Sequence, residues 1–116
     1  MAKVRLLVLV LAALWLWPAC APLSTSSAVR EAEAQVFKAK KEGAAKYAKY
    51  EYYSAVYYLR KAKLTEGYSE FGVAQQYSTR AKEMAMKAQT EAKENRLREQ
   101  ILKKRLKQRD KFRRAK

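Results

Sequence analysis

Histidine is absent from the sequence, and cysteine occurs only once, at Cys20. One cysteine cannot form an intramolecular disulfide, and without histidine the chain has neither a Cys–His catalytic pair nor the common zinc ligand sets. Two prolines and three glycines are few breaks for 116 residues. This scarcity favours long helices and argues against a sheet protein with many turns.

Motifs that carry enzyme chemistry are also missing. The sequence has no glycine-rich loop that would hold a phosphate and no nucleophile motif. Acidic pairs such as Glu31 with Glu33 lie among lysines, where they indicate solvated helix faces rather than a general acid and base. We therefore expect a protein that is not an enzyme and that uses no cofactor and no metal.

Basic residues outnumber acidic ones by 26 to 11, which gives a formal net charge of +15. Residues 93–116 carry 12 basic and 3 acidic side chains, whereas residues 20–92 carry 12 and 8, so the excess is a C-terminal feature. In a cytosolic protein such an excess points first to nucleic acid. In an exported protein it points to anionic lipid, cell-wall polymer or acidic partner proteins.

The first twenty residues have the pattern of an export signal. Two basic residues precede the apolar run LLVLVLAALWLW (residues 6–17), and Ala19 and Cys20 follow it closely. A positive segment, a short apolar run and a small-residue boundary are the parts of a secretory signal peptide. Twelve apolar residues are short for a membrane span, which needs about 20. A cleaved signal is the favoured interpretation, and an uncleaved anchor is the alternative.

The position of Cys20, preceded by Ala19 and followed by a serine-rich stretch, resembles the lipobox of bacterial lipoproteins. In that family the cysteine is acylated and becomes the first mature residue. The resemblance implies a signal peptide over residues 1–19, cleavage between Ala19 and Cys20, and a lipidated Cys20 with a flexible stalk over residues 20–26. It places the chain in the bacterial cell envelope, on the outer membrane facing the periplasm. An unmodified cysteine is the alternative.

Apolar residues from Ser27 onward recur in steps of three and four, the period of one helix face. The spacing predicts a helix over residues 27–42 that Gly43 ends, a second that ends near Gly67, and a third that starts at Tyr68. The expected inner positions are Val29, Ala32, Val36, Ala39, Ala48, Tyr52, Ala55, Leu59, Ala62, Tyr68, Phe71, Ala74, Tyr77, Ala81, Ala85, Ala88 and Ala92. We expect an all-α antiparallel hairpin or three-helix unit over residues 27–92, with a thin core.

The stretch from residue 51 to residue 89 resembles the tetratricopeptide helix-turn-helix. Gly67-Tyr68 matches the turn between its two helices, and Ala81, Ala85 and Ala88 match the small packing positions of its later helix. Together with the lipobox, residues 28–92 resemble a family of short, alanine-rich bacterial envelope lipoproteins with tetratricopeptide-like helices. This resemblance implies a fold and a location, but no activity.

Six of the eight tyrosines lie within residues 47–58. Tyr50, Tyr53 and Tyr57 share a helix face apart from the alanine positions. The six rings either pack against the neighbouring helices with their hydroxyls in water, which we favour, or form an exposed patch for a partner, and we expect some of the six in each role. The candidate partner surface is Tyr50, Tyr53 and Tyr57.

The C-terminal tail, residues 93–116, changes the phase of its apolar residues. One face carries Leu97, Ile101 and Phe112, broadened by Leu102 and Leu106. At about 100° per residue, Leu97 lies roughly 160° around the helix from Ala81. We expect the third helix to run past the bundle as a basic amphipathic segment that contacts anionic membrane or an acidic partner, with a solvated extension as the alternative. The basic residues expected to bind are Lys103, Lys104, Arg105, Lys107, Arg109, Lys111, Arg113 and Arg114.

These patterns together predict a membrane-tethered, non-enzymatic lipoprotein that acts as a helical scaffold or protein-interaction module. Its expected partners are the membrane, through the lipid anchor, and an anionic lipid, a cell-wall polymer or an envelope protein. Two alternatives stay open. One is a basic nucleic-acid-binding helical protein, if the N-terminus is not an export signal. The other is a small single-pass membrane subunit with an uncleaved anchor.

Overall fold

The structure is a computed structural model that describes residues 21–115, and within this range it is all-α with no strand. It contains helices α2 (Ala21–Lys41), α3 (Ala44–Tyr47), α4 (Lys49–Gly67) and α5 (Phe71–Arg114). The expected all-α class is confirmed. The expected signal peptide over residues 1–19 lies outside the described residues.

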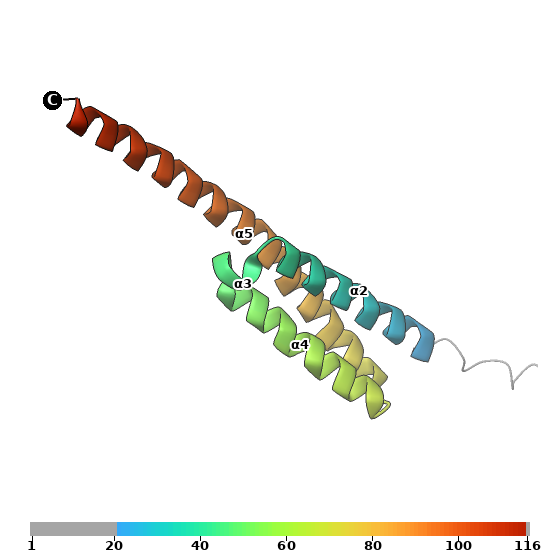
Figure 1. Cartoon of the computed structure of the whole chain (residues 1–116). Coiled ribbons are helices and arrows are strands. Elements are labelled where there is room, and N and C mark those ends of the chain that lie inside the picture. The colour runs from blue at the N-terminus through green and yellow to red at the C-terminus, as the bar shows by residue number, and fades with distance from the viewer. Residues whose placement is uncertain (1–20, 116) are drawn as a thin grey trace, which may run out of the picture.

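Three long helices form a bundle in which α2 runs parallel to α5 and α4 runs antiparallel to both (Figure 1). The direction of α2 against α5 follows from two ion pairs, Glu31 with Lys82 and Glu42 with Lys93. The direction of α2 against α4 follows from the hydrogen bond of Ser26 with Glu66 and the ion pair of Glu33 with Lys63. The N-terminal end of α2 therefore lies beside the turn that joins α4 to α5.

The core is a line of small side chains between the three helices, as the helical period predicts. Its buried hydrophobic members are Val29, Ala32, Val36, Ala39, Ala44, Ala48, Ala55, Leu59, Ala62, Ala74, Ala81, Ala85, Ala88 and Ala92. Alanine lets the helices approach closely but buries little apolar area per residue. Half-buried larger side chains complete the packing around this line, namely Tyr47, Tyr52, Val56, Tyr58, Tyr77 and Met84.

Two turns divide the helices close to the expected positions. Gly43 has a φ of 82°, in the left-handed region that glycine adopts without a steric penalty, and it ends α2 as expected. The short helix α3 follows Gly43 and was not expected as a separate element. The third helix begins at Phe71 rather than at Tyr68, whose side chain is 73% exposed. Tyr68 belongs to the turn because α4 ends at Gly67 and the chain must reverse there.

Residues 21–26, which the sequence pattern assigns to a flexible stalk, instead form the first turns of α2. Thr25 is buried, and the Ser26 hydroxyl donates a hydrogen bond to the Glu66 carboxylate at 2.6 Å. Thr25 precedes Val29 by four residues and Ala32 by seven, so it continues the inner face of the helix. Burial of Thr25 and the contact of Ser26 with α4 explain why a serine-rich stretch is helical here.

The last helix is much longer than its neighbours. α5 spans 44 residues, and its last buried residue is Ala92. The part beyond Ala92 adds about 33 Å of helix at 1.5 Å per residue. It projects from the end of the bundle opposite to the start of α2 (Figure 1). The expectation that the third helix runs past the bundle is confirmed.

Candidate functional site

Cys20 and Ala19, the expected lipidation and cleavage positions, lie outside the described residues. The described chain begins one residue later, with Ala21 as the first residue of α2. Over residues 21–115, no helix combines the length and the apolar character that a membrane span requires.

The outer face of α4 carries an aromatic surface made of Tyr50, Tyr53 and Tyr57. Their exposed fractions are 71%, 60% and 55%. At about 100° per residue, all three lie between roughly 120° and 180° around the helix from Leu59, which points into the core. These three rings therefore do not pack against the neighbouring helices. They are exposed at the positions named as the candidate partner surface, and the binding of a partner there stays a prediction. They face away from the bundle because the narrow alanine face on the other side of α4 is the one that packs.

The other tyrosines of α4 do pack. Tyr52 and Tyr58 are half-buried against the core, and the Tyr58 ring stacks on Tyr77 of α5 with centroids 6.3 Å apart. Each also meets an exposed ring edge-on, since Tyr52 contacts Tyr53 at 5.2 Å and Tyr58 contacts Tyr57 at 5.5 Å. The buried rings thus hold the exposed rings in fixed positions.

A shallow hollow of about 380 Å³ lies on this aromatic surface. It is lined by Lys49, Tyr50, Tyr53, Ser54, Tyr57 and Tyr58. Exposed tyrosines on a rigid helix contribute large contact areas at little cost in side-chain entropy, which is why tyrosine is enriched at the centres of protein interfaces. The arrangement suits the binding of a protein or peptide side chain.

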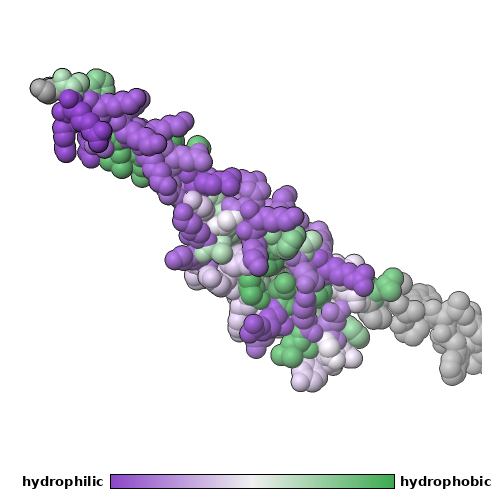
Figure 2. Space-filling model, viewed as in Figure 1, coloured by the Kyte–Doolittle hydropathy of each residue, from purple (hydrophilic) through white to green (hydrophobic). Residues whose placement is uncertain are grey.

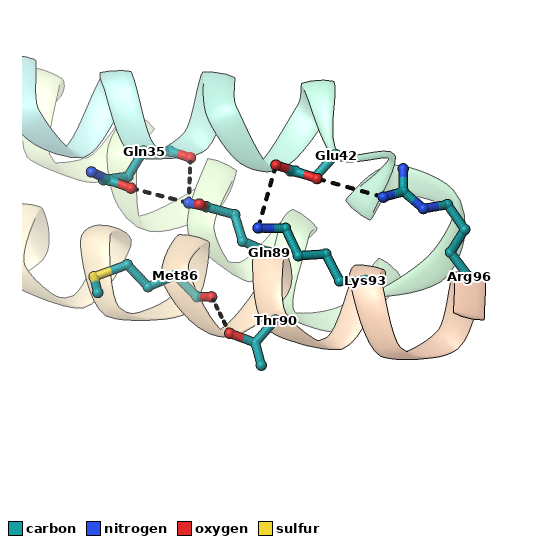
Figure 3. Close-up of polar contacts among 7 residues, drawn as sticks. All are labelled: Gln35, Glu42, Met86, Gln89, Thr90, Lys93 and Arg96. Carbon is teal, nitrogen blue, oxygen red and sulfur yellow. Dashed lines mark hydrogen bonds and ion pairs between the residues drawn. The ribbon is translucent and has the colours of Figure 1, made fainter. Parts of the chain in front are cut away.

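Polar contacts fix the position of α2 against α5 (Figure 3). Gln89, which is 8% exposed, donates from its amide to the Gln35 backbone oxygen at 3.2 Å and to the Gln35 side-chain oxygen at 3.0 Å. Further along, the Glu42 carboxylate contacts Lys93 at 3.5 Å and Arg96 at 3.9 Å. These contacts reach the last buried turn of α5, so the bundle is held together up to the point where the tail begins.

A second polar group, which we call the exit cluster, surrounds the point where α5 leaves the bundle. It comprises Lys46, Tyr47, Asn95, Glu99 and Lys103. The Asn95 amide donates to the Tyr47 backbone oxygen at 2.7 Å, and Glu99 lies 2.6 Å from the Lys103 ammonium and 3.7 Å from that of Lys46. The hydrogen bond from Lys103, followed by one from Tyr47, lowers the pKa of Glu99 to about 2.

Glu51 and Glu91 bring two half-buried carboxyl groups together between α4 and α5. Partial burial raises the pKa of Glu91, and the hydrogen bond and charge of the Glu51 carboxyl raise it further. No group of three or more potential metal ligands occurs within residues 21–115. This pair is an interhelical contact, and nothing around it supplies a nucleophile or an anion-binding loop.

The basic residues proposed from the sequence are all exposed on the projecting part of α5. Residues 100–115 hold eight basic side chains and one acidic one. Lys103 pairs with Glu99, whereas no ion pair within the described chain involves a basic residue from Lys104 to Arg114. The apolar residues of the tail are exposed as well, namely Leu97, Ile101, Leu102, Leu106 and Phe112.

Sequence reasoning missed Gln89 and the exit cluster. The signal for Asn95 and Glu99 was available, because the steps of three and four that join Ala85, Ala88 and Ala92 continue directly to them. No signal in the sequence marks Tyr47 as the acceptor, since its backbone oxygen becomes available only because α3 ends there.

Comparison of the chain with known proteins found no matching family model, no matching curated protein and no matching solved structure.

Proposed function

We propose that this protein is a non-enzymatic lipoprotein of the bacterial cell envelope, tethered to the outer membrane through Cys20. The bundle acts as a scaffold that offers two binding surfaces, the aromatic surface of α4 and the basic tail. The signal-like pattern of residues 1–19 and the position of Cys20 directly before α2 support the tether. The antiparallel pair of α4 and α5, joined at Gly67-Tyr68, supports a tetratricopeptide-like unit.

One observation supports this proposal: the start of α2 and the end of α5 lie at opposite ends of the described structure. α2 starts at one end of the bundle and is about 31 Å long, and α5 runs about 33 Å past its last buried residue, Ala92, and leaves the bundle at the other end (Figure 1). A lipid at Cys20 would hold the first turn of α2 at the membrane. An upright bundle then carries the basic tail away from that membrane, toward partners in the periplasm.

The absence of a stalk strengthens this orientation. Because residues 21–26 are helical and Thr25 is buried, the bundle begins immediately after the proposed lipid. A protein attached through a long linker could tumble freely above the surface, whereas a rigid helix that starts at the anchor restricts that motion. The scaffold therefore has a defined direction.

The mature N-terminus tests the tether. We expect mass spectrometry of the native protein to find a first residue Cys20 that carries a diacylglyceryl group, and Cys20→Ser to leave unprocessed precursor. The proposal fails if the mature chain starts elsewhere or if Cys20 carries a free thiol.

Deletion of residues 97–116 provides the matched comparison. This variant should remain in the membrane fraction as fully as the intact chain, because the proposed anchor lies at the other end of the molecule. If the deletion, and not Cys20→Ser, releases the protein from the membrane, the tail is itself the membrane-binding element and the proposed direction is wrong.

A further inference from the structure

The line of α5 that faces α4 continues beyond the end of α4. Within the bundle this line includes Tyr77, which stacks on Tyr58, and Asn95, which binds Tyr47. At about 100° per residue, Leu102 and Leu106 both lie within about 20° of Asn95 around the helix. They repeat the helix position of the half-buried Tyr77 and Asn95 at a level that α3 and α4 do not reach, and both are exposed.

The line of α5 that faces α2 continues differently. Within the bundle it includes Gln89 and Lys93, which contact α2. Beyond the bundle the same line carries Lys107 and Lys111, each within about 40° of Gln89, with Lys104 about 60° away. The two faces of the tail therefore differ: lysine occupies the α2 side, and leucine occupies the α4 side.

Arginine borders the leucine line on one side. Arg105 and Arg109 lie between about 40° and 80° from the phase of Asn95, next to Leu102 and Leu106. Neither guanidinium has an ion-pair partner among residues 21–115. Arginine forms paired hydrogen bonds with carboxylates and is more weakly hydrated than lysine, so it suits a contact from which water is excluded. This face combines an apolar line with unpaired donors for carboxylates.

Figure 2 shows hydrophobic surface along the side of the projecting helix on which α4 lies in Figure 1, and hydrophilic surface along its other edge. This side does not suit a flat surface. Packed helices lie about 8–10 Å apart, so α3 and α4 protrude beyond Leu102 and Leu106 by about the width of a helix. A planar membrane that contacted Leu102 and Leu106 would collide with them. A second copy of the tail is disfavoured by charge, with eight basic residues against one acidic residue on each helix.

We propose that an acidic amphipathic helix of a partner protein packs on Leu102, Leu106, Arg105 and Arg109, in line with α4. Its apolar residues cover the two leucines, and its carboxylates pair with the arginines. The contact extends from about Arg98 to Arg113, which corresponds to about 23 Å, or four turns, of the partner helix. This inference deepens the proposed function by naming the partner of the tail, and it rests on the role of the chain as an interaction module.

A designed peptide provides the test. The probe is an 18-residue helix with leucine in steps of three and four and glutamate on both sides of the leucine line, and its control is a peptide of the same composition in scrambled order. The full chain is placed in nanodiscs of zwitterionic lipid, with empty nanodiscs as the blank. We expect the patterned peptide to bind at least about tenfold more tightly than the scrambled one, because only it buries the two leucines together.

Matched variants locate the contact. Leu102→Gln with Leu106→Gln should abolish the preference for the patterned peptide. Leu97→Gln should leave it unchanged, since Leu97 is 57% exposed and Leu102 is 58% exposed but the two point to different faces. Arg105→Gln with Arg109→Gln should weaken binding more than Lys107→Gln with Lys111→Gln, which removes the same charge from the other side.

Three results would overturn the inference. The first is equal binding of the patterned and scrambled peptides. The second is competition with the peptide by single-stranded DNA or by vesicles with anionic lipid, if the two leucine substitutions weaken binding of that competitor as strongly as they weaken binding of the peptide. The third is an equal loss of peptide affinity in the variant with both arginine substitutions and in the variant with both lysine substitutions. None of these bears on lipidation of Cys20, so failure here and failure of the proposed tether remain distinguishable.

Discussion

The side-chain amide of Asn95 donates a hydrogen bond to the backbone oxygen of Tyr47 at 2.7 Å, at the level where α5 leaves the bundle. Tyr47 is the last residue of α3, and Ala48 after it has a φ of −141°, so the carbonyl group of Tyr47 cannot continue the hydrogen bonds of a helix. Asn95 supplies the missing donor from another helix. The contact ties the end of α3 to the last packed turn of α5.

Replacement of Asn95 by alanine tests this link. Asn95→Ala should lower the free energy of unfolding by about 1 kcal/mol, because it leaves a half-buried carbonyl without its donor. Urea denaturation followed by circular dichroism measures the change. Gln100→Ala, in the exposed part of the same helix, should have no effect. Equal stabilities of the two variants would contradict the role of Asn95.

Leu59 is the largest side chain in the buried line of α4. Leu59→Ala should cost about 2–3 kcal/mol of unfolding free energy, because it removes buried methyl groups from a core made mainly of alanine. Leu64→Ala is the control, because Leu64 lies in the same helix and is 51% exposed. If both substitutions cost the same, the buried face of α4 has been assigned incorrectly.

Glu99 should titrate with a pKa of about 2, below the ordinary 4.5, because Lys103 and Tyr47 donate hydrogen bonds to its carboxylate. A pKa that is lower in the folded state gives stability that is present above about pH 4.5 and is lost as the pH falls toward 2. Carboxyl carbon chemical shifts in a pH titration measure the pKa. Lys103→Gln should raise it, and an unchanged titration in that variant would show that Lys103 is not the cause.

Glu91 should show the opposite behaviour. Its pKa is raised by partial burial and then by Glu51, so its folded-state stabilisation is present at low pH and is lost as the pH rises through the raised pKa. Glu91→Gln should therefore raise the thermal midpoint at pH 7, and the gain should shrink in acid, where the native carboxyl is protonated. Glu83→Gln on the exposed side of α5 is the control. A gain that persists unchanged at low pH would contradict this cause.

The spacing of the alanines in steps of three and four marks one face of each helix, and this spacing correctly predicts the buried face of the bundle. The same reasoning left open which of the six tyrosines in residues 47–58 pack against the core. A tyrosine ring can lie on a buried or an exposed face, and only the width of the packed face decides between them. α4 packs through Ala55, Leu59 and Ala62, and that face leaves no room for three further rings.

The two ends of the bundle were predicted less well than its middle. The lipobox resemblance predicts a stalk over residues 20–26, whereas residues 21–26 are helical and Ser26 is bonded to Glu66 of α4. The leucines of the tail were treated as one broad face. Placement of Leu102 and Leu106 on the side of α4, with Leu97 pointing to a different face, required the positions of the neighbouring helices, which a single sequence does not supply.

The direction of the scaffold is the central claim, and depth-dependent fluorescence quenching tests it most directly. If lipid occupies Cys20, a cysteine introduced by Leu23→Cys or by Gln108→Cys is the single free thiol and can carry a fluorophore. In zwitterionic vesicles with a quencher at the lipid headgroups, the account predicts strong quenching of the label at position 23 and little or none at position 108. Equal quenching at both positions would mean that the tail lies on the membrane, and it would contradict the account.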